Sequence, residues 1–143
     1  MNADTSPKVS VGHVCIEISS ITRSRKFYEP LLKSLGFQVI MDEEDSMGFR
    51  IGALSIFLGQ PAFRRVERKA PRADEFVVAD HIALLVPDRK TVNEVTLTMK
   101  KAGFEPLFAP EEHPEFVPGY YSVSFCDHDN NVIEFYVIEK RSS

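Results

Sequence analysis

The sequence predicts an α+β protein made of two tandem modules, each with the order strand, helix, strand, strand, strand (βαβββ). One observation behind this prediction is that strand-like alternation, helical spacing and turn residues follow one another twice in the same order. The other is register. His13 and His81 open the two copies 81 − 13 = 68 positions apart, and Gly36 and Gly103, which follow the helical segments, lie 103 − 36 = 67 positions apart. These near-equal separations indicate an internal duplication.

Length and composition favour one globular domain. A chain of 143 residues buries roughly 70% of the surface of its unfolded state. We therefore expect a single domain over residues 1–143, with module one at about 9–60, a linker at 61–79 and module two at about 80–140. The net charge of −4 argues against nucleic acid as a partner. The sequence shows no membrane-spanning apolar run and no secretory signal pattern at its start, so we expect a cytoplasmic protein without a membrane partner.

The opening strand is expected over Val9–Ile18, and its alternation separates two faces. The apolar side chains of Val14, Ile16 and Ile18 form the face that packs into the core. The other face carries Val11, His13, Cys15 and Glu17. A histidine, a cysteine and a glutamate at every second position are typical either of a solvated strand face or of a face that lines a ligand cavity.

The rest of module one is expected to form a helix and three short strands. The helix lies between Ser20 and Gly36, with Ser20 or Thr22 as the N-cap and Pro30 as a candidate for a kink. Its apolar stripe consists of Phe27, Leu31, Leu32 and Leu35. The strands are expected near Gln38–Met41, Phe49–Ile51 and Leu54–Leu58.

Module two repeats this order. A strand is expected at His81–Val86 and a helix from Asp88 to Lys101, where Val92, Val95, Met99 and Ala102 have helical spacing. Further strands are expected near Glu105–Phe108, Tyr120–Cys126 and Val132–Ile138. The last two are joined by Asp127–Asn131, whose Asp and Asn residues favour a tight turn in which Asn130 adopts the left-handed conformation.

Two further features of the sequence are a basic cluster between the modules and a pair of cysteines. The inter-module segment carries a cluster of basic residues, Arg64, Arg65, Arg68, Lys69 and Arg72, which we interpret as a solvated linker, with an anion-steering patch as the alternative. Cys15 and Cys126 lie in apolar strand-like runs, so we expect two buried thiols rather than a disulfide.

The order of motifs resembles a known family. His13, the helical segment SITRSRKFYEPLLKSLGF, His81, KAGF and the closing DHDNNVIEFY are similar in type and separation to those of the vicinal oxygen chelate superfamily. This superfamily includes glyoxalases, fosfomycin-resistance enzymes, bleomycin-binding proteins and extradiol dioxygenases, and the resemblance covers about Ser10 to Lys140. It implies that the two βαβββ modules form a cup-shaped mixed β-sheet with a divalent metal ion on its inner wall.

The resemblance also implies a set of metal ligands: His13 and His81 on the first strands of the two modules, and Glu134 on the last strand of module two. Two imidazoles and one carboxylate suit Zn, Ni, Mn or Fe and leave coordination positions open for substrate oxygens. Taken alone, a histidine on a half-buried strand is more often a hydrogen-bonded core residue than a ligand.

The sequence departs from two subfamilies of this superfamily. Glyoxalases place a fourth, proton-shuttling ligand on the last strand of module one, where this chain has Ile56 or Phe57. The departure argues against a lactoylglutathione lyase because the general base is missing. Extradiol dioxygenases have a tyrosine three residues before the Asp of the final turn, where this chain has Ser124, and His113 lies too far upstream to match their additional histidine.

Other residues are candidates for catalysis or substrate binding. Glu17 shares the His13 face and is a candidate base or partner of an imidazole, alongside Glu134 as ligand and catalytic residue. Arg50 is a candidate for an anionic group of the substrate. The phenols of Tyr120, Tyr121 and Tyr136 are candidate substrate contacts.

The function that best fits these residues is a glyoxalase-like metalloenzyme, a lyase, isomerase or dioxygenase that acts on a small substrate with two neighbouring oxygens. The metal would act as a Lewis acid. The alternative is a metal-free binding protein of the bleomycin-resistance type, which sequesters a drug or metabolite. In either case the modules are expected to pair between two chains, which predicts a homodimer.

Overall fold

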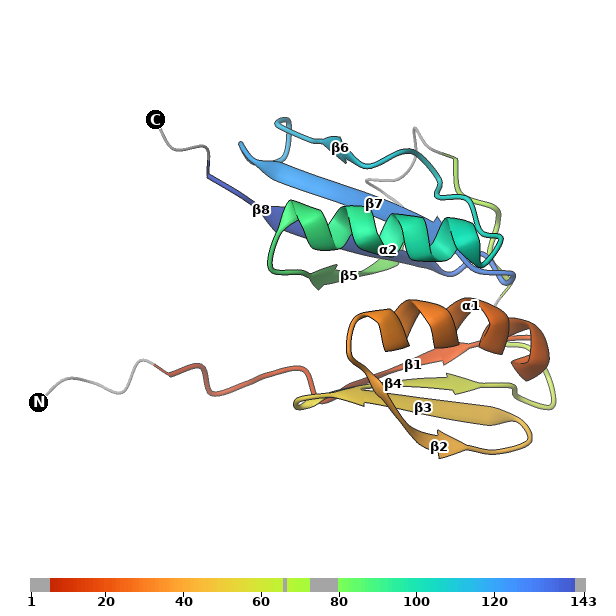
Figure 1. Cartoon of the computed structure of the whole chain (residues 1–143). Helices are drawn as coiled ribbons and strands as arrows, with labels where there is room; N and C mark the ends of the chain where they lie inside the picture. The colour runs from red at the N-terminus through yellow and green to blue at the C-terminus, as the bar shows by residue number, and fades with distance from the viewer. Residues whose placement is uncertain (1–5, 66, 73–79, 141–143) are drawn as a thin grey trace, which may run out of the picture.

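Two βαβββ modules follow one another in the computed structural model, which describes residues 6–65, 67–72 and 80–140. Module one comprises β1 (His13–Glu17), α1 (Ile21–Ser34), β2 (Gln38–Asp42), β3 (Ser46–Ile51) and β4 (Leu54–Gly59). Module two comprises β5 (His81–Leu85), α2 (Arg89–Lys101), β6 (Glu111–Glu112), β7 (Tyr120–Cys126) and β8 (Val132–Ile138). The predicted α+β class and the duplication are confirmed (Figure 1).

Each module contains one mixed four-stranded sheet. The strand order is β1-β4-β3-β2 in the first sheet and β5-β8-β7-β6 in the second. In both sheets the first and last strands of the module pair in parallel, and the other neighbours pair antiparallel. Within the described residues β1 and β5 are both edge strands, so the mixed sheet is divided into two halves rather than continuous across the modules.

Capping residues determine where the two helices begin and end. Ser20 caps α1 by accepting from the backbone N–H of Arg23, and Asp88 caps α2 by accepting from that of Thr91. Gly36 and Gly103 follow the two helices with φ angles of 93° and 92°, which glycine adopts at little steric cost. Helix α1 continues through Pro30.

Two predicted strands differ from those observed. The first strand begins at His13 rather than Val9, since residues 9–12 form no ladder. The strand predicted at Glu105–Phe108 is wrong, and the short strand β6 lies at Glu111–Glu112 instead. Pro106 and Pro110 lack the backbone N–H that a ladder requires, which explains why no regular strand forms between them.

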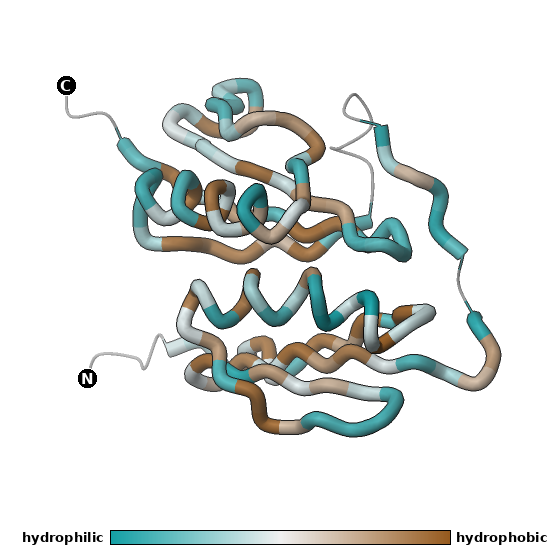
Figure 2. Tube along the Cα trace, turned by 45° about the vertical axis from the view of Figure 1, so that its right-hand side comes forward, coloured by the Kyte–Doolittle hydropathy of each residue, from teal (hydrophilic) through white to brown (hydrophobic). Residues whose placement is uncertain are grey.

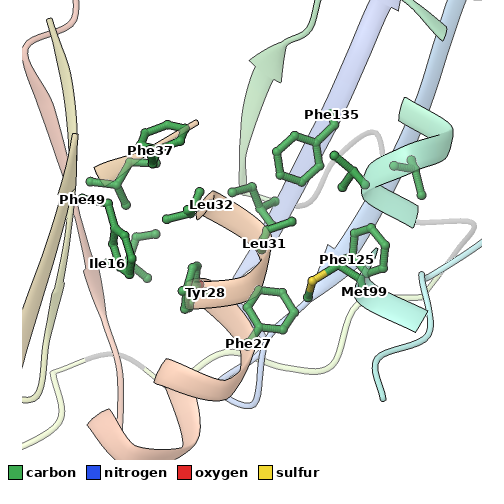
Figure 3. Close-up of a cluster of buried hydrophobic side chains, with 14 of the residues drawn as sticks. Ile16, Phe27, Tyr28, Leu31, Leu32, Phe37, Phe49, Met99, Phe125 and Phe135 are labelled. Atoms are coloured by element: carbon green, nitrogen blue, oxygen red, sulfur yellow. The ribbon is translucent and has the colours of Figure 1, made fainter. Parts of the chain in front are cut away.

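The core joins the two modules through the helices. Figure 3 shows α1 between the strands of module one and the elements of module two, with Phe27, Leu31 and Leu32 directed into the cluster. The ring of Phe27 contacts that of Phe104 edge to face, with centroids 5.1 Å apart. Figure 2 shows the hydrophobic colouring concentrated along the strands, with hydrophilic residues in the β2–β3 turn. Burial of apolar surface thus holds the modules together.

Each sheet has a second face, opposite to the helices, which we call the helix-free face. Alternation along β4 and β8 buries Ile56, Leu58 and Phe135 against the helices. It therefore directs Phe57 and Glu134 to the helix-free faces. The candidate site residues lie mainly on these faces. No helix of the described residues is long and apolar enough to cross a membrane.

Candidate functional site

A polar cluster around one buried carboxylate lies on the helix-free face of module two. Glu134 is 1% exposed, and one of its carboxylate oxygens, Oε1, accepts a hydrogen bond of 2.6 Å from the hydroxyl of Tyr120. Its other oxygen, Oε2, lies 3.2 Å from Nε2 of His81. The strands that supply these residues are neighbours, because β8 pairs with both β5 and β7. The sheet therefore places a histidine and a tyrosine on the two sides of one buried carboxylate.

The tyrosines stabilise this arrangement. The rings of Tyr120 and Tyr136 are stacked, with centroids 4.9 Å apart and an interplanar angle of 11°. Burial of Tyr120, together with its hydrogen bond to Glu134, raises the pKa of its phenol well above the ordinary value. The hydroxyl therefore stays protonated at neutral pH and donates to the carboxylate.

The segment before β7 covers part of this face. Phe116 packs edge to face on Tyr120 with ring centroids 5.4 Å apart, and His113 stacks on Phe116 at 5.3 Å. Ser122 and Ser124 lie beneath on β7, fully buried, and their hydroxyls have no hydrogen-bond partner among the described residues. Ser124 stands directly opposite Glu134 in the ladder. This segment thus covers the β7 side of the module-two face, while His81 and Leu85 on the β5 side stay exposed.

Module one has a different residue at the position equivalent to Glu134. His13 pairs with Ser55, and Cys15 with Phe57, in the register in which His81 pairs with Val132, and Ala83 with Glu134. The equivalent of Glu134 is therefore Phe57, while Ile56 is in the core. This decides between the two positions that the sequence left open for a fourth ligand.

Phe57 rests on a glycine. A Cβ atom at Gly48 would come within 2.8 Å of the Phe57 ring, so only glycine at this position lets the ring lie as it does. The ring also contacts the exposed imidazole of His13 edge to face, with centroids 5.9 Å apart. His13 therefore lies against an aromatic ring rather than a carboxylate.

The predicted metal ligands are only partly assembled within one chain. His81 and Glu134 are in contact, but no group of three His, Cys, Asp or Glu residues in the described part of the chain is close enough to hold a metal ion. At its Glu17 end β1 is hydrogen-bonded to module two, where the Glu17 carbonyl accepts from the side chain of Asn131 at 3.0 Å. His13 lies four residues away from that end, or about 13 Å along an extended strand. A single chain therefore does not provide the predicted three-ligand set.

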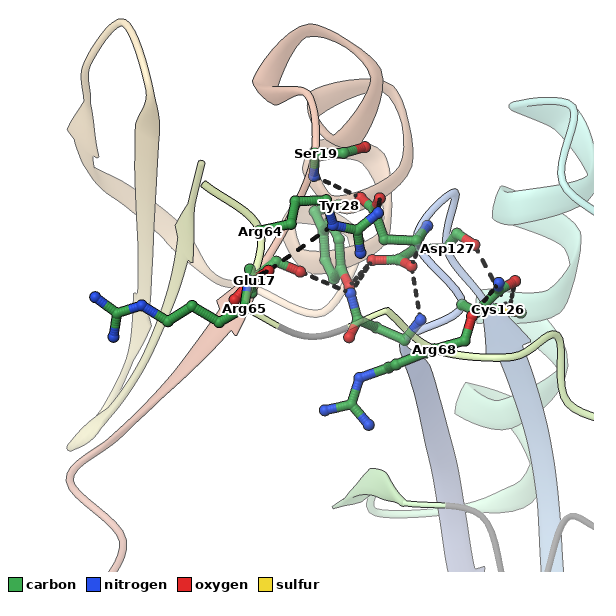
Figure 4. A network of polar contacts seen from close by, with 11 residues as sticks. Glu17, Ser19, Tyr28, Arg64, Arg65, Arg68, Cys126 and Asp127 are labelled. Atoms are coloured by element: carbon green, nitrogen blue, oxygen red, sulfur yellow. Dashed lines mark hydrogen bonds and ion pairs between the residues drawn. The ribbon is translucent and has the colours of Figure 1, made fainter. Parts of the chain in front are cut away.

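Glu17, the candidate base, is held by the inter-module segment. Its Oε1 accepts from the backbone N–H of Arg65 at 3.0 Å and lies 3.8 Å from Nε of Arg64 (Figure 4). Arg64 also lies 3.3 Å from a carboxylate oxygen of the buried Asp129. This part of the linker is consequently attached to both modules, while its arginine side chains stay exposed to solvent as expected from its charge.

The turn 127–131 connects the modules. Asp127 accepts a hydrogen bond of 2.6 Å from the buried hydroxyl of Tyr28, and Asp129 accepts one of 2.9 Å from the backbone N–H of Ser19. Burial and the adjacent Asp127 carboxylate raise the pKa of Tyr28 well above its ordinary value. Asn130 has a φ of 62°, which confirms its predicted left-handed conformation.

The remaining candidates lie on different faces. Nε of Arg50 donates to the hydroxyl of Ser55 at 3.1 Å, which places Arg50 beside His13 on the helix-free face. Tyr121 lies on the helix side of β7, where its hydroxyl donates to Asn93 at 2.7 Å. The guanidinium of Arg89 lies over its ring. The structure thus separates Tyr121 from Tyr120 and Glu134.

The two cysteines are free thiols. The prediction of two buried thiols is wrong for Cys15, which is exposed because β1 directs it to the open helix-free face. Cys126 is half-buried, and burial raises the pKa of its thiol to about 11.

Several contacts between residues of the site were not predicted from the sequence. The contact of Tyr120 with Glu134 depends on the β7–β8 register, which motif spacing alone does not fix. Gly48 within a predicted strand region was an available signal, since a strand glycine often marks a close approach of another group.

A family model for the glyoxalase/bleomycin resistance protein/dioxygenase superfamily matches residues 10–135. The chain belongs to this superfamily. No curated protein matches the sequence. Among solved structures, the chain is similar to a glyoxalase-like protein of Bacillus halodurans, with 22% identity, a TM-score of 0.71, and coverage of 91% of this chain and 96% of that one.

Other similar structures have different named activities. The fosfomycin resistance protein FosX of Listeria monocytogenes has 18% identity and a TM-score of 0.66, with coverage of 90% and 93%. The lactoylglutathione lyase of Agrobacterium tumefaciens has 17% identity and a TM-score of 0.64, with coverage of 92% and 96%. At these identities the likeness establishes the glyoxalase fold and leaves the reaction to the site residues.

Proposed function

We propose that this superfamily member is a divalent-metal-dependent enzyme that acts on a small substrate with two neighbouring oxygens. The observation that carries the proposal is the buried carboxylate of Glu134, which lies between the hydroxyl of the half-buried Tyr120 and the imidazole of His81. A carboxylate that is 1% exposed carries a large desolvation cost, which a structural role in a sheet does not require. Such clusters are typical of functional sites.

We further propose that the site is completed in a homodimer, in which His13 of one chain approaches His81 and Glu134 of the other. Within one chain the described strands leave β1 and β5 as edge strands, and apolar side chains near them are exposed, Val11 by 65% and Leu85 by 68%. Unpaired edges with apolar neighbours are suited to association with a second copy. A light-scattering mass of one chain at high concentration would contradict this assembly.

The residues of the chain have separate tasks in this site. Zn, Ni, Mn or Fe bound there would supply Lewis-acid stabilisation of negative charge on a substrate oxygen. Tyr120 holds Oε1 of Glu134, which leaves Oε2 directed toward His81. Arg50 is placed to receive an anionic group, and Glu17 remains the candidate base nearest to the junction. Tyr136 contributes a ring wall beside Tyr120.

A metal-free binding protein is the second candidate, and one observation favours it. His81, Glu134 and Tyr120 satisfy one another without any ion in this arrangement. A closed network of this kind is stable as a wall of a binding site. The two candidates differ in whether the helix-free face binds a metal before it binds a ligand.

Metal titration separates these candidates. Protein purified without chelator, analysed for bound elements and titrated calorimetrically with Zn, Ni, Mn and Fe, is expected to bind about one ion per chain. Glu134→Gln keeps the shape of the side chain and removes its charge, and is expected to weaken binding about 100-fold. The matched control Tyr121→Phe, on the opposite face of the sheet, is expected to bind as the wild type does. No ion bound at micromolar concentration would favour the metal-free binding protein.

A further inference from the structure

An open pocket lies on the helix-free face of module one. Its volume is about 590 Å³, within the range of small-molecule sites. Its wall is formed by β1, β2, β3 and β4 together with the start of the linker. The residues that line it and are used below are Glu17, Met41, Asp45, Phe57, Pro61 and Arg65.

The floor of this pocket is apolar. Phe57 presents its ring there because Gly48 leaves room beneath it. Met41 and Pro61 extend the apolar surface on either side. An exposed concave surface of this composition favours a ligand with an aromatic or aliphatic part, since contact removes apolar area from water.

One cation at the rim is available to a ligand. The backbone N–H of Arg65 is fixed on Glu17, and Figure 4 shows the Arg65 side chain leaving the polar network on the side of the module-one strands. Arg64, not Arg65, supplies the guanidinium beside the Glu17 carboxylate. Among the described residues no carboxylate lies within ion-pair distance of the Arg65 guanidinium, so its donors are open to an anion.

The opposite charge at the rim limits the ligand to a small net charge. Asp45 lines the same pocket at the β2–β3 turn, where its carbonyl accepts from the backbone N–H of Gln60 at 2.8 Å. Its carboxylate repels a second anionic group. The pocket therefore combines an apolar floor, one open guanidinium and two carboxylates, of which that of Glu17 is held by the backbone N–H of Arg65 beside the Arg64 guanidinium.

From this combination we propose that the module-one pocket binds a small amphipathic monocarboxylate, with its apolar part on Phe57 and its carboxylate on Arg65. The inference rests on the proposed function and deepens it, because it names the substrate class for the module-one half of the site. Arg65 acts as a specificity-determining residue, and the attachment of its backbone to Glu17 places it.

The test uses 4-phenylbutyrate and its neutral amide as probes, titrated calorimetrically into full-length protein in the presence of a chelator. The wild type is expected to bind the carboxylate about 10-fold more tightly than the amide. Arg65→Gln is expected to bind both probes with the affinity of the amide, with an unchanged melting temperature because its backbone contact is kept. Arg23→Gln on α1 is the matched control and is expected to behave as the wild type.

Equal affinity of the wild type for acid and amide, or an Arg65→Gln variant that keeps the preference for the acid, would overturn the proposal. A second variant, Phe57→Ala, is expected to lower the affinity for both probes equally. Unchanged affinity would show that the probes do not bind on the apolar floor. The metal titration distinguishes this failure from failure of the proposed function. If the wild type shows no preference for the acid over the amide but still binds about one ion per chain, only the pocket assignment is rejected. If the wild type binds the probes as expected but binds no metal, only the metalloenzyme proposal is rejected.

Discussion

The two modules share a backbone and differ on their helix-free faces. In equivalent ladder positions, module one has Phe57 where module two has Glu134, while His13 and His81 correspond. The module-two carboxylate is buried and held by Tyr120, whereas the module-one ring lies on Gly48 beside an open pocket. The two modules therefore share a scaffold but have different faces, one polar around a buried carboxylate and the other apolar and open; in the proposed dimer these faces are complementary halves of one site.

The segments before β3 and β7 explain why part of the module-two face is covered and the module-one face is not. In module one, β2 pairs along β3 over five residues, Gln38–Asp42, and a short turn follows. In module two the equivalent strand β6 has two residues, and the preceding segment carries Phe108, His113 and Phe116 over β7. Module two thus has a shorter ladder here, with aromatic rings packed beside Tyr120, and Ser122 and Ser124 of β7 are buried.

The largest expected effect comes from giving module one the carboxylate of module two. Wild-type protein is expected to convert the methylglyoxal–glutathione hemithioacetal negligibly, even with Zn, Ni, Mn or Fe added, because Phe57 supplies no base. Phe57→Glu is expected to raise lactoylglutathione formation about 100-fold, since a positioned general base contributes at least that factor. If the wild type forms lactoylglutathione efficiently and His81→Ala loses this activity, the claim that Phe57 leaves the site without a base is contradicted and the protein is a true glyoxalase.

A smaller effect is expected where the modules meet. Tyr28→Phe removes the buried hydrogen bond to Asp127 and is expected to lower the free energy of unfolding by about 2 kcal/mol. Tyr121→Phe, whose hydroxyl contacts Asn93 near the surface, is expected to change it by less than about 0.5 kcal/mol. Urea unfolding measures both. Equal losses would show that the module junction has no special role in stability.

The smallest effect concerns the two helix caps and depends on pH. Hydrogen bonds from the hydroxyl and backbone N–H of Thr91 lower the pKa of Asp88 below its ordinary value of 3.8. A lowered folded-state pKa stabilises the protein above the unfolded value, and this contribution disappears as pH falls through the folded value. The destabilisation caused by Asp88→Ala should therefore shrink from pH 6 to pH 3.

The cap of α1 is the control for that series. Ser20 caps α1 with a hydroxyl that does not titrate in this range, so the loss caused by Ser20→Ala, about 1 kcal/mol, should be independent of pH. Urea midpoints at several pH values compare the two variants. A pH-independent loss for Asp88→Ala would contradict the electrostatic part of its cap.

Sequence patterns predicted the fold because local signals repeat. The caps Ser20 and Asp88, the glycines after the helices and the alternation of β1 and β8 each depend on near neighbours in the chain. Pro106 and Pro110 argue against a strand at Glu105–Phe108, but the prediction gave more weight to the hydrophobic pattern of this segment.

The site was less predictable because it depends on register and on distance across modules. The family resemblance implied His81 and Glu134 as two of three metal ligands, and the structure brings these two into contact. The sequence did not separate Tyr120 from Tyr121, which adjoin in sequence and lie on opposite faces of β7. Nor did it show that His13 stands apart from the other two predicted ligands within one chain.

The most direct test of the complementary-halves account is complementation between His13→Ala and His81→Ala chains. Each variant alone is expected to bind no metal tightly. In a mixed dimer refolded from both, one of the two shared sites retains His13 from one chain and His81 from the other. Calorimetric titration of the purified mixed dimer is therefore expected to show about one ion per two chains at wild-type affinity. A mixed dimer that binds no metal, while the wild type binds it, would contradict a site shared between modules of different chains.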